Sequence, residues 1–262
     1  IAVFGTNLSG YLGIEHPLLR IGYMPSVTFS DMSGVSNNAS AFHLLSSNWI
    51  IAGLILSILA LHGWQRGIAG NFQEHIKQLF RGWTSRKLVP LSIFTLLFLC
   101  TSGMIFYKTN VEAEYLSSDS VLDRRAEYER KYKHYEEEHW LYPISISTDV
   151  ALFPFERTYS VDAVYTLSNK SDTVVNRALF IEKKPITHIS LERAILINQD
   201  STHGIFEFEF NSPVLPRDSV KLTFSANGAH TGLRSGRDLV DNGSFVHLRD
   251  FSPYLGYTDN YG

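Results

Sequence analysis

The sequence has little cysteine and no clear excess of charge of either sign. Its 262 residues include one cysteine, Cys100, so the chain can form no internal disulfide and no cysteine-based zinc site. The 23 basic residues are outnumbered by 26 acidic ones, which gives a net charge of −3. Nucleic-acid binding needs a basic surface that replaces the counterions around phosphates, so the composition argues against nucleic acid as a partner.

Motifs of the common catalytic sites are also missing. The chain contains no H-E-x-x-H, P-loop, G-x-G-x-x-G or G-x-S-x-G. No two histidines stand four residues apart, and His134 and His139, five apart, do not share a helical face. The histidines at 203, 230 and 247 fall in polar loops, where we expect them to be solvated. We therefore assign no catalytic, cofactor-binding or metal-ligating residue to this chain.

The sequence does contain two long apolar runs. Residues 88–107 carry no charge, and as a helix they would cover roughly 30 Å, the thickness of a bilayer's hydrocarbon core. Residues 49–61 form a shorter run, which uncharged flanks extend and which Trp49 and Trp64 border as interfacial aromatics would. The sequence predicts two transmembrane helices within 44–107.

The segment between these runs sets their orientation. Residues 65–87 carry five basic residues against the single acid Glu74, and short basic loops stay in the cytoplasm. We expect residues 1–43 to be an irregular extracytoplasmic loop and the chain beyond 107 to lie outside as well. The basic loop is either a solvated connector or a contact for anionic lipid or an ATPase subunit. With no initiator Met and no signal-peptide pattern, the chain is expected to be an excerpt of a longer protein.

Residues 108–141 are predicted to form a charged spacer helix. Ser120 and Asp123 have the spacing of a capping box at its start. Tyr128, Tyr132 and Tyr135 fall on one helical face, so this face is expected to lie against another part of the protein.

From about residue 142 the hydrophobic period changes to two, which predicts an all-β extracytoplasmic domain over 142–262. Phe206, Phe208 and Phe210 alternate with Glu207 and Glu209, and their face is expected to be core. The tail from about 227 is interpreted as loops with a short strand near 243–248. Strands are predicted at 144–152, which we expect to be half-buried, and at 159–167, 178–182, 188–197, 205–210 and 220–225.

The order of these features resembles a group of large bacterial membrane proteins. Y-x-L-x-N-K-S/T-D is matched at residues 165–172, and a second likeness lies in "LPRDS" at 215–219, with further likeness in "AEYERKYKHYE" and "DNGSFVHLRD". In this group an ABC transporter permease-like membrane region is fused to an extracytoplasmic aminopeptidase N-like zinc metallopeptidase.

The resemblance implies a membrane α-helical hairpin followed by an all-β domain, a sandwich or saddle-like sheet of the aminopeptidase N N-terminal type. It implies a multi-pass protein of the bacterial cytoplasmic membrane, whose partners are the lipid bilayer, upstream permease helices and a downstream catalytic domain. Zinc is expected in that catalytic domain and in no part of this chain, which is noncatalytic in itself. The alternative is a membrane-anchored β-sandwich that acts as an interaction module without enzymatic activity.

Overall fold

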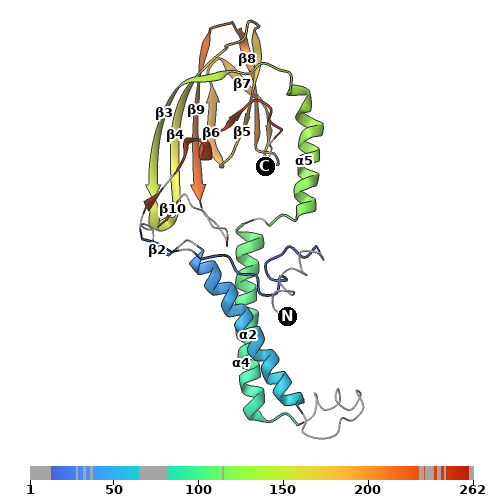
Figure 1. Ribbon diagram of the computed structural model, residues 1–262. Helices are drawn as coiled ribbons and strands as arrows, with labels where there is room; N and C mark the ends of the chain where they lie inside the picture. The colour runs from blue at the N-terminus through green and yellow to red at the C-terminus, as the bar shows by residue number, and fades with distance from the viewer. Residues whose placement is uncertain are drawn as a thin grey trace. The chain divides into compact units, whose positions relative to one another are not determined.

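The computed structural model describes residues 13–27, 29–31, 34–35, 38–64, 82–113, 115–229, 233, 239–240, 243–244 and 246–259. Its contacts divide the chain into two compact units. One contains the apolar helices, and the other contains a charged helix and the β-strands (Figure 1). Each unit is described by itself.

The first unit is a pair of apolar helices, α2 (Ala39–Gly63) and α4 (Ser85–Phe106), the latter continued by the π-helical turn η1 (Tyr107–Val111). Two very short strands, β1 (Phe29–Ser30) and β2 (Gly34–Val35), precede them. Both helices are long and apolar enough to cross a membrane. Only 11% of the most apolar part of α2 and 6% of that of α4 is buried, whereas the core helix of a soluble protein would be mostly buried.

The two helices are joined by a polar contact. Asn48 of α2 is 1% exposed, and its Oδ1 accepts hydrogen bonds from Thr101 Oγ1 at 2.8 Å and Ser102 Oγ at 2.9 Å on α4. A polar side chain in an apolar setting is stabilised when a neighbouring helix supplies its partners. Of the basic loop, residues 65–81 lie outside the described residues, while Arg86 and Lys87 begin α4.

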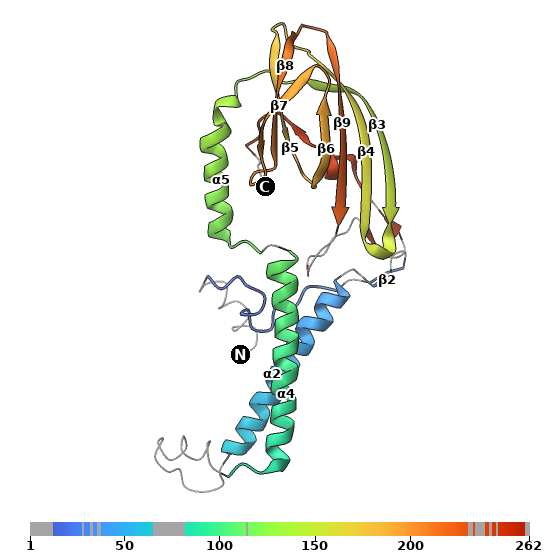
Figure 2. The ribbon, with the colours of Figure 1, turned by 180° about the vertical axis from the view of Figure 1, so that it is seen from behind.

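The second unit contains two four-stranded antiparallel sheets (Figure 2). The first has the order β3-β4-β9-β6 and the second the order β12-β5-β8-β7. A helix, α5 (Ser118–Tyr132), continued by the turn η2 (Lys133–Tyr135), precedes them in the chain. The strands are β3 (Tyr142–Phe153), β4 (Thr158–Ser168), β5 (Val175–Ile181), β6 (Ile186–Leu191), β7 (Ala194–Asp200), β8 (Ile205–Val214), β9 (Ser219–Ala229) and β12 (Tyr254–Leu255).

The inner faces of the two sheets share one hydrophobic core. Alternate residues of β4 and β9 pack with the phenylalanines of β8, and Tyr165 and Phe224 meet edge to face at 5.1 Å. The predicted core role of Phe206, Phe208 and Phe210 is confirmed, since all three are buried there. Helices followed by an all-β region are thus what the structure shows.

A buried asparagine closes the end of the sandwich at which β4 stops and β9 starts. Asn169 is fully buried, and its Nδ2 donates to the carbonyl oxygens of Thr173 at 2.7 Å and Val214 at 3.0 Å. Its main-chain N–H donates to the carbonyl oxygen of Asp218 at 3.0 Å, and its own carbonyl accepts from the N–H of Arg217 at 2.9 Å. The segments 165–172 and 215–219, far apart in sequence, therefore form one corner.

Four local predictions are corrected. The predicted strand 188–197 is two strands, because Arg193 takes a left-handed φ of 61° and turns the chain between β6 and β7. The N-cap of helix α5 is Ser117, three residues before the predicted Ser120, and its side chain accepts from the N–H of Ser120. The tail does contain a short strand within 243–248, β11 (Gly243–Ser244), which pairs with β10 (Leu239–Val240). It is not otherwise made of loops alone, since it adds β12 to the second sheet and a short helix, α6 (Leu248–Phe251).

Strand β3 is the fourth correction, since it was predicted to be half-buried. It lies at the edge of the first sheet, and of its twelve residues all but Val150 are exposed. The strand pairs with β4 along its length, so that Ile146 and Leu152 stand beside the buried Tyr165 and Tyr159. The second sheet covers β4 but leaves β3 open, which the alternation of apolar residues along β3 could not reveal.

Candidate functional site

The most elaborate polar arrangement of the second unit lies where α5 packs on the second sheet. Tyrosines at 128, 132 and 135 recur four and three residues apart, which brings them to one side of a helix. Each is at most 5% exposed, and they pack on Leu179, Ile181 and Ile205 of the sheet. The prediction that this face lies against another part of the protein is confirmed.

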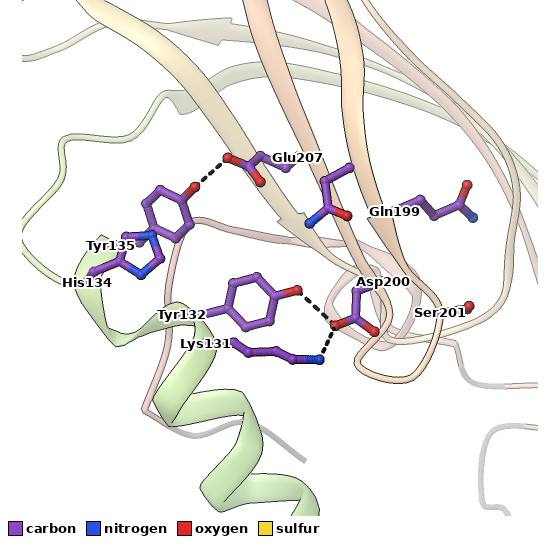
Figure 3. Close-up of a pocket in the computed structure, with 9 residues that line it drawn as sticks. Lys131, Tyr132, His134, Tyr135, Gln199, Asp200, Ser201 and Glu207 are labelled. Atoms are coloured by element: carbon purple, nitrogen blue, oxygen red, sulfur yellow. Dashed lines mark hydrogen bonds and ion pairs between the residues drawn. The ribbon is translucent and has the colours of Figure 1, made fainter.

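Two of these tyrosines end on carboxylates. The Tyr132 hydroxyl donates to Asp200 Oδ2 at 2.9 Å, and the Tyr135 hydroxyl donates to Glu207 Oε1 (Figure 3). Glu207 is also 3.5 Å from Arg177 of β5, and Lys131 lies 3.4 Å from Asp200. Buried carboxylates need such donors, because an unpaired charge away from water is costly.

A third group, His203, is fully buried beneath α5, so the expectation of a solvated histidine is wrong. Its Nδ1 lies 2.9 Å from Asp200 Oδ2, and its Nε2 lies 3.3 Å from the main-chain carbonyl oxygen of Arg124 on α5. Asp200 Oδ1 accepts the main-chain N–H groups of Thr202 and His203, which forms the turn between β7 and β8. Gly204, with a φ of +63°, completes that turn and lets the histidine fold back under the helix.

The electrostatics favour a charged Asp200 and neutral tyrosines. Burial alone would raise the pKa of Asp200, but hydrogen bonds from His203 and Tyr132 outweigh it and hold the pKa well below its usual range. Burial and the neighbouring Glu207 raise the pKa of Tyr135 to about 12. Burial and Asp200 raise the pKa of Tyr132 in the same direction.

An open pocket of about 500 Å³ lies beside these groups. Asp200 paired with His203 has the form of a catalytic acid–histidine pair, but the second nitrogen of His203 faces the Arg124 carbonyl. Both ring nitrogens are therefore occupied by protein partners. This arrangement favours a role in attaching α5 to the sheet over a role in transferring a proton to a substrate. The pocket is lined by Lys131, Tyr132, His134, Tyr135, Asn198, Gln199, Asp200, Ser201 and Glu207.

The other histidines considered in the sequence lie elsewhere. His134 and His139 are exposed, His247 is exposed at the N-terminus of α6, and His230 lies outside the described residues. Within the part of the chain that the structure describes, no three His, Cys, Asp or Glu side chains come together as metal ligands would. Only the tyrosine spacing signalled the site in advance. A sequence D-x-x-H-G between two strands is too common to have indicated the Asp200–His203 pair.

Comparison with solved structures gives a weak likeness to part of a known protein. No protein-family model and no curated protein matches this chain. Among solved structures, the M1 zinc metallopeptidase from Deinococcus radiodurans matches with a TM-score of 0.28 and 14% identity over 35% of this chain. The match covers 21% of the peptidase chain, so it relates a part of this chain to a small part of that protein.

Proposed function

We propose that this chain is the membrane anchor and the noncatalytic β domain of a larger permease–zinc aminopeptidase fusion. The observation that carries the proposal is the direct succession of an apolar helix pair and a β-sandwich with a helix held against it by tyrosines. In this proposal the β-sandwich is the N-terminal domain of the peptidase, and the zinc site belongs to a catalytic domain further along the parent protein.

The exposure of α2 and α4 supports the anchor. Few of their residues are buried, which suits lipid as the surrounding medium, and Asn48 supplies the kind of polar contact that joins helices in a bilayer. The basic residues within 65–87 favour a cytoplasmic loop, which would place the β-sandwich outside.

The corner around Asn169 supports the peptidase part of the proposal. The two motifs on which the resemblance depends most meet there, with Asn169 bonded to both Asp218 and Arg217. Both segments therefore help to form the same corner of the β-sandwich, as motifs characteristic of a fold would.

One observation favours the alternative, an interaction module without enzymatic activity. Strand β3 exposes Ile144, Ile146 and Leu152, and exposed apolar side chains that gather on one strand suit a protein partner. An intact parent protein would distinguish the two functions.

The first experiment is to isolate the natural protein from membranes, measure its intact mass and assay it on fluorogenic aminoacyl amides with and without a zinc chelator. A mass several times that of this chain together with chelator-sensitive cleavage supports the fusion. A mass near 29.7 kDa without cleavage supports the interaction module.

The second experiment tests the anchor and its orientation. In a Cys100→Ala background, single cysteines replace Lys170 of the β-sandwich or Gln73 of the basic loop, and a membrane-impermeant maleimide is added to intact spheroplasts. We expect labelling at 170 at once and at 73 only after lysis. Equal labelling at both positions in intact spheroplasts would refute the proposed topology.

A further inference from the structure

The connection between β3 and β4 carries an exposed aromatic tip. Phe153 ends β3, Pro154 begins the single turn η3 (Pro154–Glu156), and Phe155 in that turn is 90% exposed. Arg157, at a left-handed φ of 54°, closes the turn. Phenylalanine side chains are usually buried in a core. Phe155 is instead exposed on a tight turn that begins with proline, so its place calls for another explanation, such as contact with a partner.

Strand register shows at which end of the sandwich this tip lies. Strands β4 and β9 pair from Thr158–Ala229 at the tip to Ser168–Ser219 at the opposite end, where the Asn169 corner holds the end of β8 at Val214. The start of β8 therefore lies toward the tip. His203, just before β8, contacts the main-chain carbonyl oxygen of Arg124 on α5. Helix α5 thus begins at the end of the unit where β3 finishes, as Figures 1 and 2 both show.

That shared end is also where the chain enters from the apolar unit. Residues 112–117 are all that separate η1, the continuation of α4, from the first residue of α5. Six residues span at most about 20 Å even when fully extended. The entry point of the sandwich is therefore tethered closely to the end of an apolar helix.

We propose that the β3–β4 tip, through Phe155 and Phe153, is a lipid-contacting site that inserts into the outer membrane–water interface beside the chain's own anchor. This inference rests on the proposed membrane anchor. Phenylalanine side chains on a membrane-facing surface bury at the boundary of headgroups and acyl chains, and a tip on the end of the domain that carries the tether can reach that boundary without unfolding. The partner is thus a lipid surface rather than a second protein.

The test uses the full chain with Cys100→Ala, reconstituted in vesicles of phosphatidylcholine and phosphatidylglycerol. A fluorescent NBD label is attached at one of three single cysteines: E156C next to Phe155, K170C at the other end of β4, or L96C in the middle of α4. Quenching is compared between lipids with shallow nitroxides, lipids with nitroxides deep in the acyl chain, which reach the label at 96, and iodide in the water. Labelling Glu156 leaves Phe155 in place, and F155S and F155W are then made in the E156C chain.

We expect the label at 156 to be quenched by shallow nitroxide lipid at least about twofold more than the label at 170, and to be shielded from iodide. F155S should return it to the behaviour of 170, while F155W should preserve the lipid contact. If 156 matches 170 while 96 is quenched by lipid, the anchor stands and the tip proposal is overturned. Shielding of 156 from iodide without lipid quenching, as a protein cover would give, also overturns it. If 96 itself escapes lipid quenching, the anchor fails and the tip proposal with it.

Discussion

Tyr135 and Glu207 show how single residues attach α5 to the sheet. Glu207 is 8% exposed on a strand whose neighbouring phenylalanines form the core, and its carboxylate is held by the Tyr135 hydroxyl and by Arg177. Removing one partner of a buried charge leaves the other poorly solvated, which costs more than the bond contributes in isolation. The hydroxyl of Tyr135 therefore contributes to stability in addition to the apolar packing of its ring.

Replacing Tyr135 with Phe tests this directly. The substitution keeps the packing but removes the donor to Glu207, so we expect the free energy of unfolding to fall by about 1–3 kcal/mol. Chemical denaturation of the full chain in detergent, followed by near-ultraviolet circular dichroism, measures the loss. Tyr142→Phe, at an exposed tyrosine of β3, is the matched control and should change nothing. Equal stability of both variants would show that Glu207 does not depend on Tyr135.

Asp200 predicts a dependence on acid. Because its pKa is lowered in the folded protein, its contribution is present above the unfolded value of 3.8 and is lost as the pH falls toward the folded value. Asp200→Asn should therefore be less stable than the native chain near neutral pH, and the difference should shrink once the pH drops below about 3.8. Denaturation midpoints across this range measure it, with the exposed Asp149→Asn as the control. A gap that stays constant with pH would contradict the prediction.

At the scale of elements, Asn48 joins the apolar helices. Polar contacts between helices in a bilayer contribute about 0.6–2 kcal/mol each, and this one has two donors on α4. Asn48→Ala should weaken the association of α2 with α4 by an amount in that range, measured by energy transfer between dyes on the two helices. Ser47→Ala is the matched control, because the Ser47 hydroxyl bonds within α2, to His43. Unchanged transfer in the Asn48 variant would argue against the contact.

Periodicity predicted most of the elements but not what covers them. The uncharged run 88–107 and the alternating run 159–167 became α4 and β4, since each pattern is long and regular. The division of 188–197 was missed, because the turn is made by Arg193 in a conformation that glycine usually adopts. The exposure of β3 and the burial of His203 depend on whether a segment distant in sequence packs against them. The second sheet does not cover β3, whereas α5 covers His203, and the residues around each position do not indicate this.

At the scale of the whole molecule, the second unit holds its own core. Both hydrophobic clusters of the β region consist of residues between 128 and 257. A chain truncated to start at Leu116 should therefore fold alone, with a cooperative denaturation midpoint close to that of the same region in the full chain. Loss of cooperativity, or a molten near-ultraviolet spectrum, would show that the apolar helices are needed for the fold.

The uncovered edge strand β3 has a consequence for such a truncated domain. An edge of twelve residues presents main-chain N–H and C=O groups that another chain could extend into a longer sheet. Asp149 in mid-strand, Pro143 and the bulge beside it are the kind of features that interrupt such growth. Replacing Asp149 with Val would remove the central charge from the stretch "ISISTDVAL". The truncated domain would then be prone to edge-to-edge association and fibril growth.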